Sequence, residues 1–313
     1  MTDKRSTAIF INGGAGRTIS SIPALEKFKE ENPDDDFVIV CEGGTDFYKG
    51  HPDLFNRTYD VWHKNLFQDK LKERNLLTPE PYRVFEYYNQ KCNLTQAFDI
   101  ELNQLSEVPE HTPLKLDLSK QTQVFGYSYV EEMKKLKGKD KAIVYQPFGS
   151  TAQVQGRFII DSSGRSFELK DVLRTIEELN KEAVVIMMSS LFIPTDKDLG
   201  FVGPNPQEPF DLLQWAGIIN AADHVLACDS VAQHLAAGIN KSATVVIGAT
   251  FPENISYPDN PNFHIMDLGK GRRKYSPLRI LQEAAYDLNN EDLMIMSDKQ
   301  FKDMIDHVKK EIK

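Results

Sequence analysis

The feature that most constrains this chain is a series of short, unbroken apolar runs separated by stretches with helical spacing. The runs lie at residues 8–12, 37–41, 82–86, 142–146, 183–188, 224–228 and 243–247. Unbroken runs rich in β-branched residues are typical of strands buried on both faces, as in a parallel sheet covered by helices. The sequence therefore predicts an α/β fold.

Amphipathic helices are expected between these runs. Their apolar stripes are Ile19, Ile22, Leu25 and Phe28; Val172, Leu173, Ile176 and Leu179; and Leu212, Leu213, Trp215, Ala216, Ile218 and Ile219. Pro23 falls within the first stripe, where a helix tolerates it only in the first turn. Two successive series of β-α units predict two Rossmann-like domains.

The stretch from 105 to 141 combines weak apolar spacing with dense charge, so it is the expected linker region. We place the boundary near residue 135, which gives domains 1–135 and 136–313. A last helix is expected behind Ser297, a good N-cap, because apolar residues recur at helical spacing from Phe301 to Ile312.

Composition sets limits on function. With 313 residues, 41% hydrophobic and 27% charged, the chain is typical of a soluble globular protein. It lacks both an 18-residue apolar stretch and a signal-peptide core, which predicts a cytoplasmic protein. The 37 basic and 46 acidic residues give a net charge of −9, which argues against a broad grip on polyanions. Three cysteines without metal-ligand spacing are read as buried thiols.

A glycine-rich loop follows the first apolar run, at residues 12–18. Backbone amides of Gly14 and Gly16 could approach a ligand there, and the following helix N-terminus would favour an anion. The dinucleotide fingerprint is half met, because Ile19 stands at its third glycine, while Glu42 lies near the position of a ribose-binding acid. An NAD enzyme and a simple tight turn both stay open as interpretations.

Two further polar segments follow strand candidates at 224–228 and 243–247. Asp229 directly follows the first of these strands, and Ser230 and His234 are four residues apart on one helical face. Thr250 lies in the small-residue turn after the second strand. Because parallel strands end at one edge of a sheet, these loops are expected to point at one ligand site. The alternative is that Asp229 caps the helix and His234 satisfies a buried neighbour.

The order of these motifs resembles glycosyltransferase family 9, the ADP-heptose:lipopolysaccharide heptosyltransferase-like proteins of GT-B fold. The residues that carry the resemblance are GRTISSIPAL at 16–25, GRSF at 164–167, PFDLLQWAGIINAADHV at 209–225 and DHVLACDSVAQHLAAGINKSATVVIGATFP at 223–252. The resemblance touches both halves of the chain.

The resemblance implies an inverting, metal-independent transfer between two Rossmann-like domains, with a C-terminal helix that crosses back to the first. The C-terminal half would hold a nucleotide sugar, and the N-terminal half a saccharide or lipopolysaccharide-like acceptor. Neither a metal nor any cofactor beyond the donor is expected. The donor residues carried over are Asp229, Ser230 and His234 at the diphosphate or sugar; Ser150, Thr151 and Arg165 beside them; Thr250 closing the pocket; and Ser189, with Met188 and Ser190, near the nucleobase.

The sequence departs from the family at the expected general base. Where the family usually has Asp after Gly, this chain has Arg17, whose guanidinium stays protonated and cannot accept a proton. Glu42 and Asp46, after the second strand candidate, are therefore the expected replacements. Arg17 could instead stabilise the leaving diphosphate.

Three other functions stay open on the same scaffold. A glycosyltransferase acting on hydroxymethylated DNA bases, as in bacteriophages, would use the basic cluster of Lys270, Arg272, Arg273 and Lys274. A binding protein without catalysis would explain Arg17 at the base position. An epimerase would act on the nucleotide sugar without an acceptor. Function lives in the site, so the fold alone does not choose among them.

Overall fold

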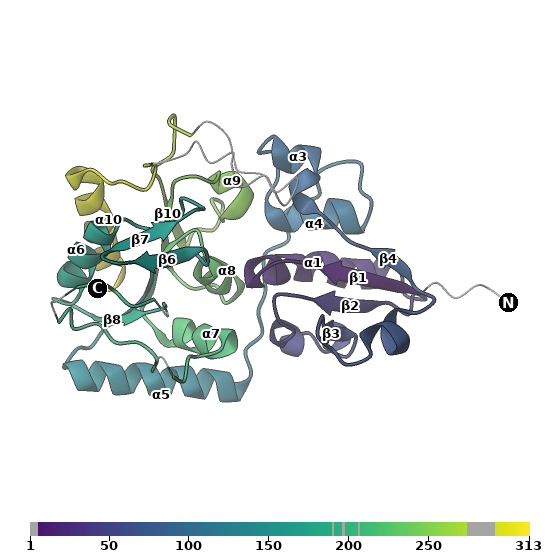
Figure 1. The fold of residues 1–313 in the computed structure, drawn as a ribbon, viewed down its shortest axis with the longest axis horizontal. Helices are drawn as coiled ribbons and strands as arrows, with labels where there is room; N and C mark the ends of the chain where they lie inside the picture. The colour runs from purple at the N-terminus through teal and green to yellow at the C-terminus, as the bar shows by residue number, and fades with distance from the viewer. Residues whose placement is uncertain (1–5, 190, 196–197, 206, 274–291) are drawn as a thin grey trace. The chain divides into compact units, whose positions relative to one another are not determined.

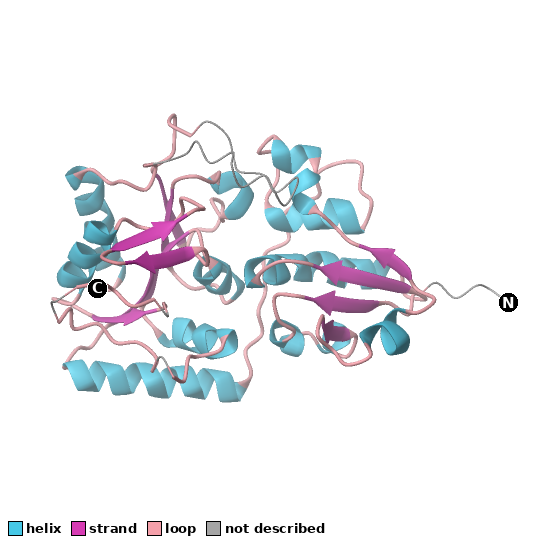
Figure 2. Ribbon diagram, viewed as in Figure 1, coloured by secondary structure: helices cyan, strands magenta, loops and turns pink. Residues whose placement is uncertain are grey.

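The protein is described by a computed structural model that covers residues 6–189, 191–195, 198–205, 207–273 and 292–313. Its internal contacts divide it into two units, Met1–Asp117 and Leu118–Lys313. Each unit is a parallel sheet flanked by helices, as Figures 1 and 2 show. The sequence had placed the boundary near residue 135. No helix in the described part of the chain is both long and apolar enough to cross a membrane.

The first unit contains a four-stranded parallel sheet in the order β3-β2-β1-β4. Its strands are β1 (Thr7–Ile11), β2 (Val38–Cys41), β3 (Thr58–Asp60) and β4 (Asn75–Leu77). Its helices are α1 (Ala15–Glu31), η1 (Asp46–Gly50), α2 (Pro52–Phe55), η2 (Phe67–Leu71), η3 (Pro81–Arg83), α3 (Phe85–Tyr88) and α4 (Leu94–Leu102). The direction of winding reverses between β1 and β4, and such a switch point is where α/β proteins bind ligands.

Two sequence expectations for this unit are wrong. Residues 82–86 form no strand, because Pro81 begins a short 3-10 helix that leads into α3. Pro23 lies in the interior of α1 rather than in its first turn. That helix tolerates the lost backbone hydrogen bond because most of its first three turns are buried in the unit's core.

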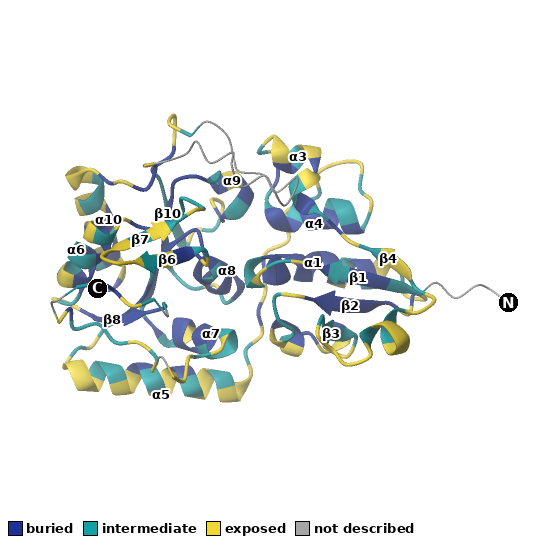
Figure 3. Cartoon of the chain, viewed as in Figure 1, coloured by how far each residue is buried: buried dark blue, intermediate teal, exposed yellow. Residues whose placement is uncertain are grey.

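The second unit contains a five-stranded parallel sheet in the order β11-β10-β9-β5-β8 and a separate β6-β7 hairpin. Its strands are β5 (Ala142–Gln146), β6 (Ala152–Gln155), β7 (Phe158–Asp161), β8 (Val184–Met187), β9 (His224–Cys228), β10 (Ala243–Ile247) and β11 (Phe263–Asp267). Its helices are α5 (Lys120–Lys137), α6 (Leu169–Leu179), α7 (Leu212–Ala221), α8 (Val231–Gly238), α9 (Pro252–Ile255) and α10 (Asp298–Glu311). Strands β5, β8, β9 and β10 are buried on both faces, as predicted (Figure 3).

Helix α5 occupies the second half of the region expected to be a linker, residues 105–141. It runs alongside α7 (Figure 1) because two glycines let the backbones meet: a Cβ at Gly126 would overlap the carbonyl of Gly217. A Cβ at Gly217 would in turn overlap the carbonyl of Thr122. The charged residues that suggested a linker lie mostly on the exposed side of α5. The division between the two units, after Asp117, falls in residues 105–119, which precede α5 and form neither helix nor strand.

Helix α10 begins with a capping box between Ser297 and Gln300, as its sequence predicted. Its stripe of Met304, Ile305 and Val308 lies in the core of the second unit, together with Ile176 of α6. The expected crossing of this helix back to the first domain is therefore wrong, because its apolar stripe is used within its own unit. The three cysteines are buried thiols, as expected.

Candidate functional site

The second sheet reverses its winding between β5 and β9, and Gln146 lies at that point. Its side-chain Oε1 accepts hydrogen bonds from Ser230 Oγ at 2.9 Å and from the backbone N–H of Ala232 at 3.0 Å. The last residue of β5 thus anchors the N-terminus of α8, which directs backbone dipoles toward the carboxyl edge of the sheet. Sequence reasoning missed Gln146, although its place at the end of a buried strand was a usable signal.

Asp229 lies at the end of β9 with only 5% of its surface exposed. One carboxylate oxygen accepts a hydrogen bond from Gln233 Nε2 at 2.8 Å. The other accepts from Thr250 Oγ1 at 2.9 Å and lies 3.8 Å from Arg165 Nη1. The structure therefore brings Asp229, Arg165 and Thr250 together, and Asp229 orients both neighbours. A fixed guanidinium beside a hydroxyl is suited to binding a diphosphate.

Asp161 organises the other side of this group. Burial alone would raise its pKa, but hydrogen bonds from Ser163, Ser166 and Thr151 hold that pKa at about 2. Ser163 Oγ in turn accepts a hydrogen bond from Arg165 Nε at 3.0 Å. A permanently ionised carboxylate therefore fixes the loop that carries Arg165. Sequence reasoning did not single out Asp161, because its partners come together only through the β6-β7 hairpin.

His234 is 7% exposed, and its Nδ1 lies 2.6 Å from the hydroxyl of Tyr257. Burial lowers its pKa to about 4, Asp229 opposing this shift and Arg165 adding to it. It is therefore neutral at pH 7 and has a buried hydrogen-bond partner. A role for His234 toward the donor stays a prediction.

The remaining donor residues vary in exposure. Ser150 is exposed and Thr151 is half-buried beside Asp161, to which its hydroxyl donates at 2.5 Å. Ser230 is buried at the start of α8. Ser189 is half-buried and its Oγ accepts from the backbone N–H of Leu191. Ser190 lies outside the described residues. A role for any of these toward a nucleotide sugar stays a prediction.

In the first unit, the glycine-rich loop binds Glu42 directly. The backbone N–H of Gly13 donates to Glu42 Oε2 at 2.6 Å, and Gly13 has a φ of +88°, which favours glycine. A Cβ at Gly43 would approach the backbone of Gly14 at 2.7 Å, so the two turns touch. Glu42 is exposed at the end of β2 with one oxygen anchored. Gly14 and Gly16 lie at the start of α1, where a ligand role stays a prediction.

Arg17 points into the unit and is only 7% exposed. Its guanidinium pairs with Glu80 at 3.1 Å and donates to the carbonyl of Pro79 at 3.3 Å. It also lies over the rings of Tyr82 and Phe98. Because Glu80 follows β4, the pair spans the switch point of the first sheet. Contact between Arg17 and a diphosphate stays a prediction, and it would compete with this pair.

Asp46 differs from Glu42 in its partner. It begins η1, is exposed, and pairs with Lys49 at 2.6 Å. Glu42 is held by an uncharged backbone amide instead, so only Asp46 has its charge compensated by a neighbouring cation.

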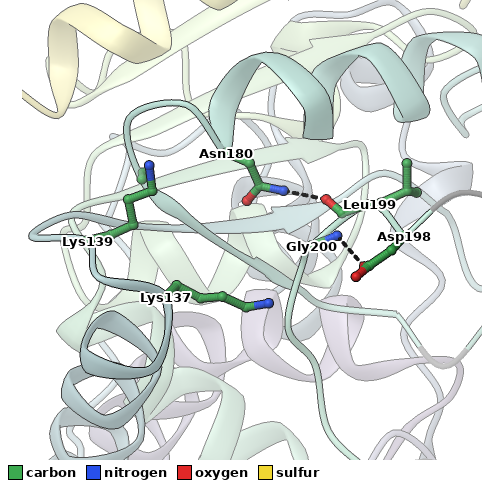
Figure 4. Close-up of a pocket in the computed structure, with 7 residues that line it drawn as sticks. Lys137, Lys139, Asn180, Asp198, Leu199 and Gly200 are labelled. Atoms are coloured by element: carbon green, nitrogen blue, oxygen red, sulfur yellow. Dashed lines mark hydrogen bonds between the residues drawn. The ribbon is translucent and has the colours of Figure 1, made fainter.

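A pocket of about 240 Å³ lies away from these groups, where α5 and α6 end and β8 begins (Figure 4). Asn180 Nδ2 donates to the carbonyl of Leu199 within it, and Lys139 Nζ donates to the carbonyl of Lys181. Helix C-termini carry negative partial charge, so this end of the sheet is poorly suited to a diphosphate. We therefore place the candidate functional groups at the carboxyl edge of the parallel sheet in each unit.

Comparison with known proteins identifies the fold. No family model matches the chain, and no curated protein matches it in sequence. A solved glycosyl transferase family 9 protein from Veillonella parvula matches with a TM-score of 0.68 and 11% identity, covering 100% of this chain and 98% of its own. This chain has the family 9 glycosyltransferase fold. E. coli heptosyltransferase WaaC with ADP gives 0.51 at 13% identity, covering 84% and 93%. E. coli ADP-heptose LPS heptosyltransferase II gives 0.53 at 9%, covering 97% and 99%.

The family 9 fold confirms the resemblance seen in the motifs, and its GT-B architecture is the predicted α/β class. The sequence places Arg17 where the family 9 motif has an acidic residue, and the structure supplies a carboxylate beside it from Glu80. Within the described residues, no group of three or more His, Cys, Asp and Glu side chains is placed to hold a metal ion. Metal independence stays a prediction.

Proposed function

We propose that the protein is an inverting glycosyltransferase that moves a sugar from a nucleotide-sugar donor to an acceptor hydroxyl on a saccharide or lipopolysaccharide-like molecule. The observation that carries this proposal is the group formed by Asp229, Arg165 and Thr250 at the carboxyl edge of the second sheet, in a chain with the family 9 fold. Two structural neighbours are E. coli heptosyltransferase WaaC with ADP and E. coli ADP-heptose LPS heptosyltransferase II. They support a nucleotide sugar as the donor.

The second unit would hold the donor. Arg165 meets the diphosphate with a charge whose direction is fixed by Asp229 and Ser163. Charge that develops on the leaving diphosphate is then stabilised by groups already in place, which lowers the barrier without reorganisation.

The first unit would hold the acceptor, with Glu42 as the general base. Its Oε2 is fixed by the Gly13 amide, which leaves Oε1 to accept the proton of the acceptor hydroxyl. Asp46 is the weaker candidate because Lys49 compensates its charge.

In the first experiment, the protein is incubated with ADP-, UDP-, GDP-, CMP- and TDP-sugars. Donor binding is measured by thermal shift, and turnover by donor hydrolysis. A shift with at least one donor is expected, and no response to any of them would overturn the proposal. Magnesium and a chelator are added in parallel. Turnover that chelator abolishes and magnesium restores would contradict metal independence.

The base is tested by Glu42→Gln, with Asp46→Asn as the matched control. We expect Glu42→Gln to lower kcat about 10²- to 10⁴-fold while donor affinity is retained, because the amide keeps its shape and cannot take a proton. Asp46→Asn is expected to keep most turnover. The reverse result would assign the base to Asp46. A wild-type protein that binds donor without turning over any acceptor would favour the binding-protein alternative.

The DNA alternative gains no support from the described part of the basic cluster. The side chain of Arg273 is only 4% exposed, forms an ion pair with Asp267 and donates to the carbonyl of Gly248 at 2.9 Å. Arg272 donates to the backbone carbonyl of Asp292 at 2.9 Å. Lys274 lies outside the described residues. These arginines hold the unit's own loops together.

A further inference from the structure

Trp62 is the most exposed large apolar side chain among the described residues, with 89% of its surface accessible. Leaving an indole in water forgoes the free energy that its burial would release, so the chain gains nothing in stability from this placement. The other tryptophan, Trp215, is 6% exposed.

The turn that carries Trp62 is well ordered by hydrogen bonds. The backbone N–H of Trp62 donates to Asp60 Oδ1 at 2.8 Å, and that of His63 donates to the Asp60 carbonyl at 2.9 Å. The ring of His63 packs edge-on against Tyr59 at 5.2 Å. The indole is therefore presented from a fixed turn at the end of β3.

This turn lies beside the proposed base. Asp60 pairs with Cys41 in the parallel register of β2 and β3, and the N–H of Val61 donates to the carbonyl of Cys41. Beyond this pair, Glu42 follows Cys41 directly and Trp62 lies two residues after Asp60, so both leave the same edge of the sheet at the ends of neighbouring strands.

We propose that Trp62 is the aromatic platform of a subsite that binds a saccharide acceptor. Carboxylate oxygens of Asp60 and Glu42 accept hydrogen bonds from the hydroxyls of that saccharide. A sugar ring has a C–H face that packs on an indole and an edge of hydroxyls that donate to carboxylates. This inference rests on the proposed function, because it places the acceptor hydroxyl next to Glu42. An anionic lipid surface is a poorer occupant, since the carboxylates of Glu42 and Asp60 would repel its headgroups.

The first experiment measures tryptophan fluorescence. Because Trp215 is buried, acrylamide quenches mainly the Trp62 component. Glucose, galactose, mannose, their disaccharides and a deacylated lipopolysaccharide core oligosaccharide are the probes. We expect at least one to protect the exposed component from acrylamide. Trp62→Ala should remove that component and leave only the emission of Trp215, which assigns the protected signal to Trp62.

The second experiment measures acceptor kinetics with the active donor. We expect Trp62→Ala to raise the acceptor KM roughly 3- to 10-fold, and Trp62→Phe to recover part of this loss because it keeps an aromatic face. Donor affinity, measured by thermal shift, should stay the same because the donor is held by the other unit. Phe67→Ala is the control. Phe67 is 62% exposed in the same β3-β4 connection, but it lies in η2 and not in the turn directly after β3.

The outcomes separate this inference from the function on which it rests. No donor response from the wild-type protein overturns the proposed function. A normal donor response, with no saccharide protecting Trp62 from acrylamide and an acceptor KM unaffected by Trp62→Ala, overturns the saccharide subsite alone. Co-sedimentation with vesicles of phosphatidylcholine and phosphatidylglycerol that Trp62→Ala abolishes would also overturn it, in favour of a membrane contact.

Discussion

Arg17, in the first turn of α1, and Asp229, at the end of β9, are both buried charges, and each meets opposite charge within its own unit. Arg17 pairs with Glu80, and Asp229 lies near Arg165. A buried charge without such a partner costs several kcal/mol, so these partners are part of the fold as much as of the site. Sequence motifs located Arg17 and Asp229 but gave no indication of Glu80.

At the scale of single residues, Arg165 carries the sharpest prediction for the donor. Arg165→Gln should weaken nucleotide-sugar binding about 10- to 100-fold, because charge-assisted hydrogen bonds contribute roughly 1.5–3 kcal/mol. Arg157→Gln removes the same charge from the exposed turn between β6 and β7 and should change affinity little. Titration calorimetry with the donor found in the panel compares the two. Equal losses would mean that only net charge matters and would contradict a specific contact.

The motifs located part of the candidate site for a physical reason. Residues at the end of an apolar run must emerge at the carboxyl edge, which is why Asp229 and Thr250 could be placed together. Asp161 and Gln146 escaped notice because their importance depends on long-range hydrogen bonds that no local spacing encodes. For His234, helical spacing gave no indication of its hydrogen-bond partner, Tyr257.

At the scale of elements, buried central strands were the most predictable part. Runs at 142–146, 224–228 and 243–247 coincide with β5, β9 and β10, because strands covered on both faces need apolar residues at every position. The edge strands β3, β4 and β11 are only partly buried, so their sequences carry no comparable signal.

The packing of α5 on α7 gives a prediction at this scale. Gly126→Ala places a methyl group on the backbone of Gly217, so the helices must separate, and the free energy of unfolding should fall by about 1–3 kcal/mol. Ser128→Ala, at an exposed position of the same helix, should be close to neutral. Urea denaturation compares the two variants. An unaffected Gly126→Ala protein would mean that α5 does not pack on α7 in solution.

At the scale of the whole molecule, the second unit contains buried histidines that make its stability depend on pH. Burial is the main cause that lowers the pKa of His224 to about 3, and nearby His307, Lys241 and His264 contribute to this shift. Its ring nitrogens lie 2.7 Å from Ser242 Oγ and 2.9 Å from Thr244 Oγ1. The pKa of His234 is about 4 for the reason given above.

These depressed values set the direction of the pH dependence. These histidines take up protons near pH 6.5 in the unfolded chain but not in the folded unit. The free energy of unfolding therefore keeps its full value above that pH and decreases below it. By pH 4.5 the loss should reach roughly 2 kcal/mol for each of the two histidines. Urea denaturation followed by Trp215 emission measures it.

His224→Gln should flatten that dependence, because glutamine does not titrate, whereas His63→Gln at an exposed position of the first unit should leave it unchanged. A pH dependence that persists unaltered in His224→Gln would assign the acid sensitivity to other groups.

The place of α10 in the core has a consequence for biosynthesis. Ile143 near the start of the second sheet and Ile312 belong to one apolar cluster. While a ribosome is still translating the messenger, the sheet between them has no cover for the face that α10 will occupy. The nascent polypeptide therefore exposes an apolar, aggregation-prone surface until the helix has left the exit tunnel. Chaperone binding would protect the chain mainly during this interval.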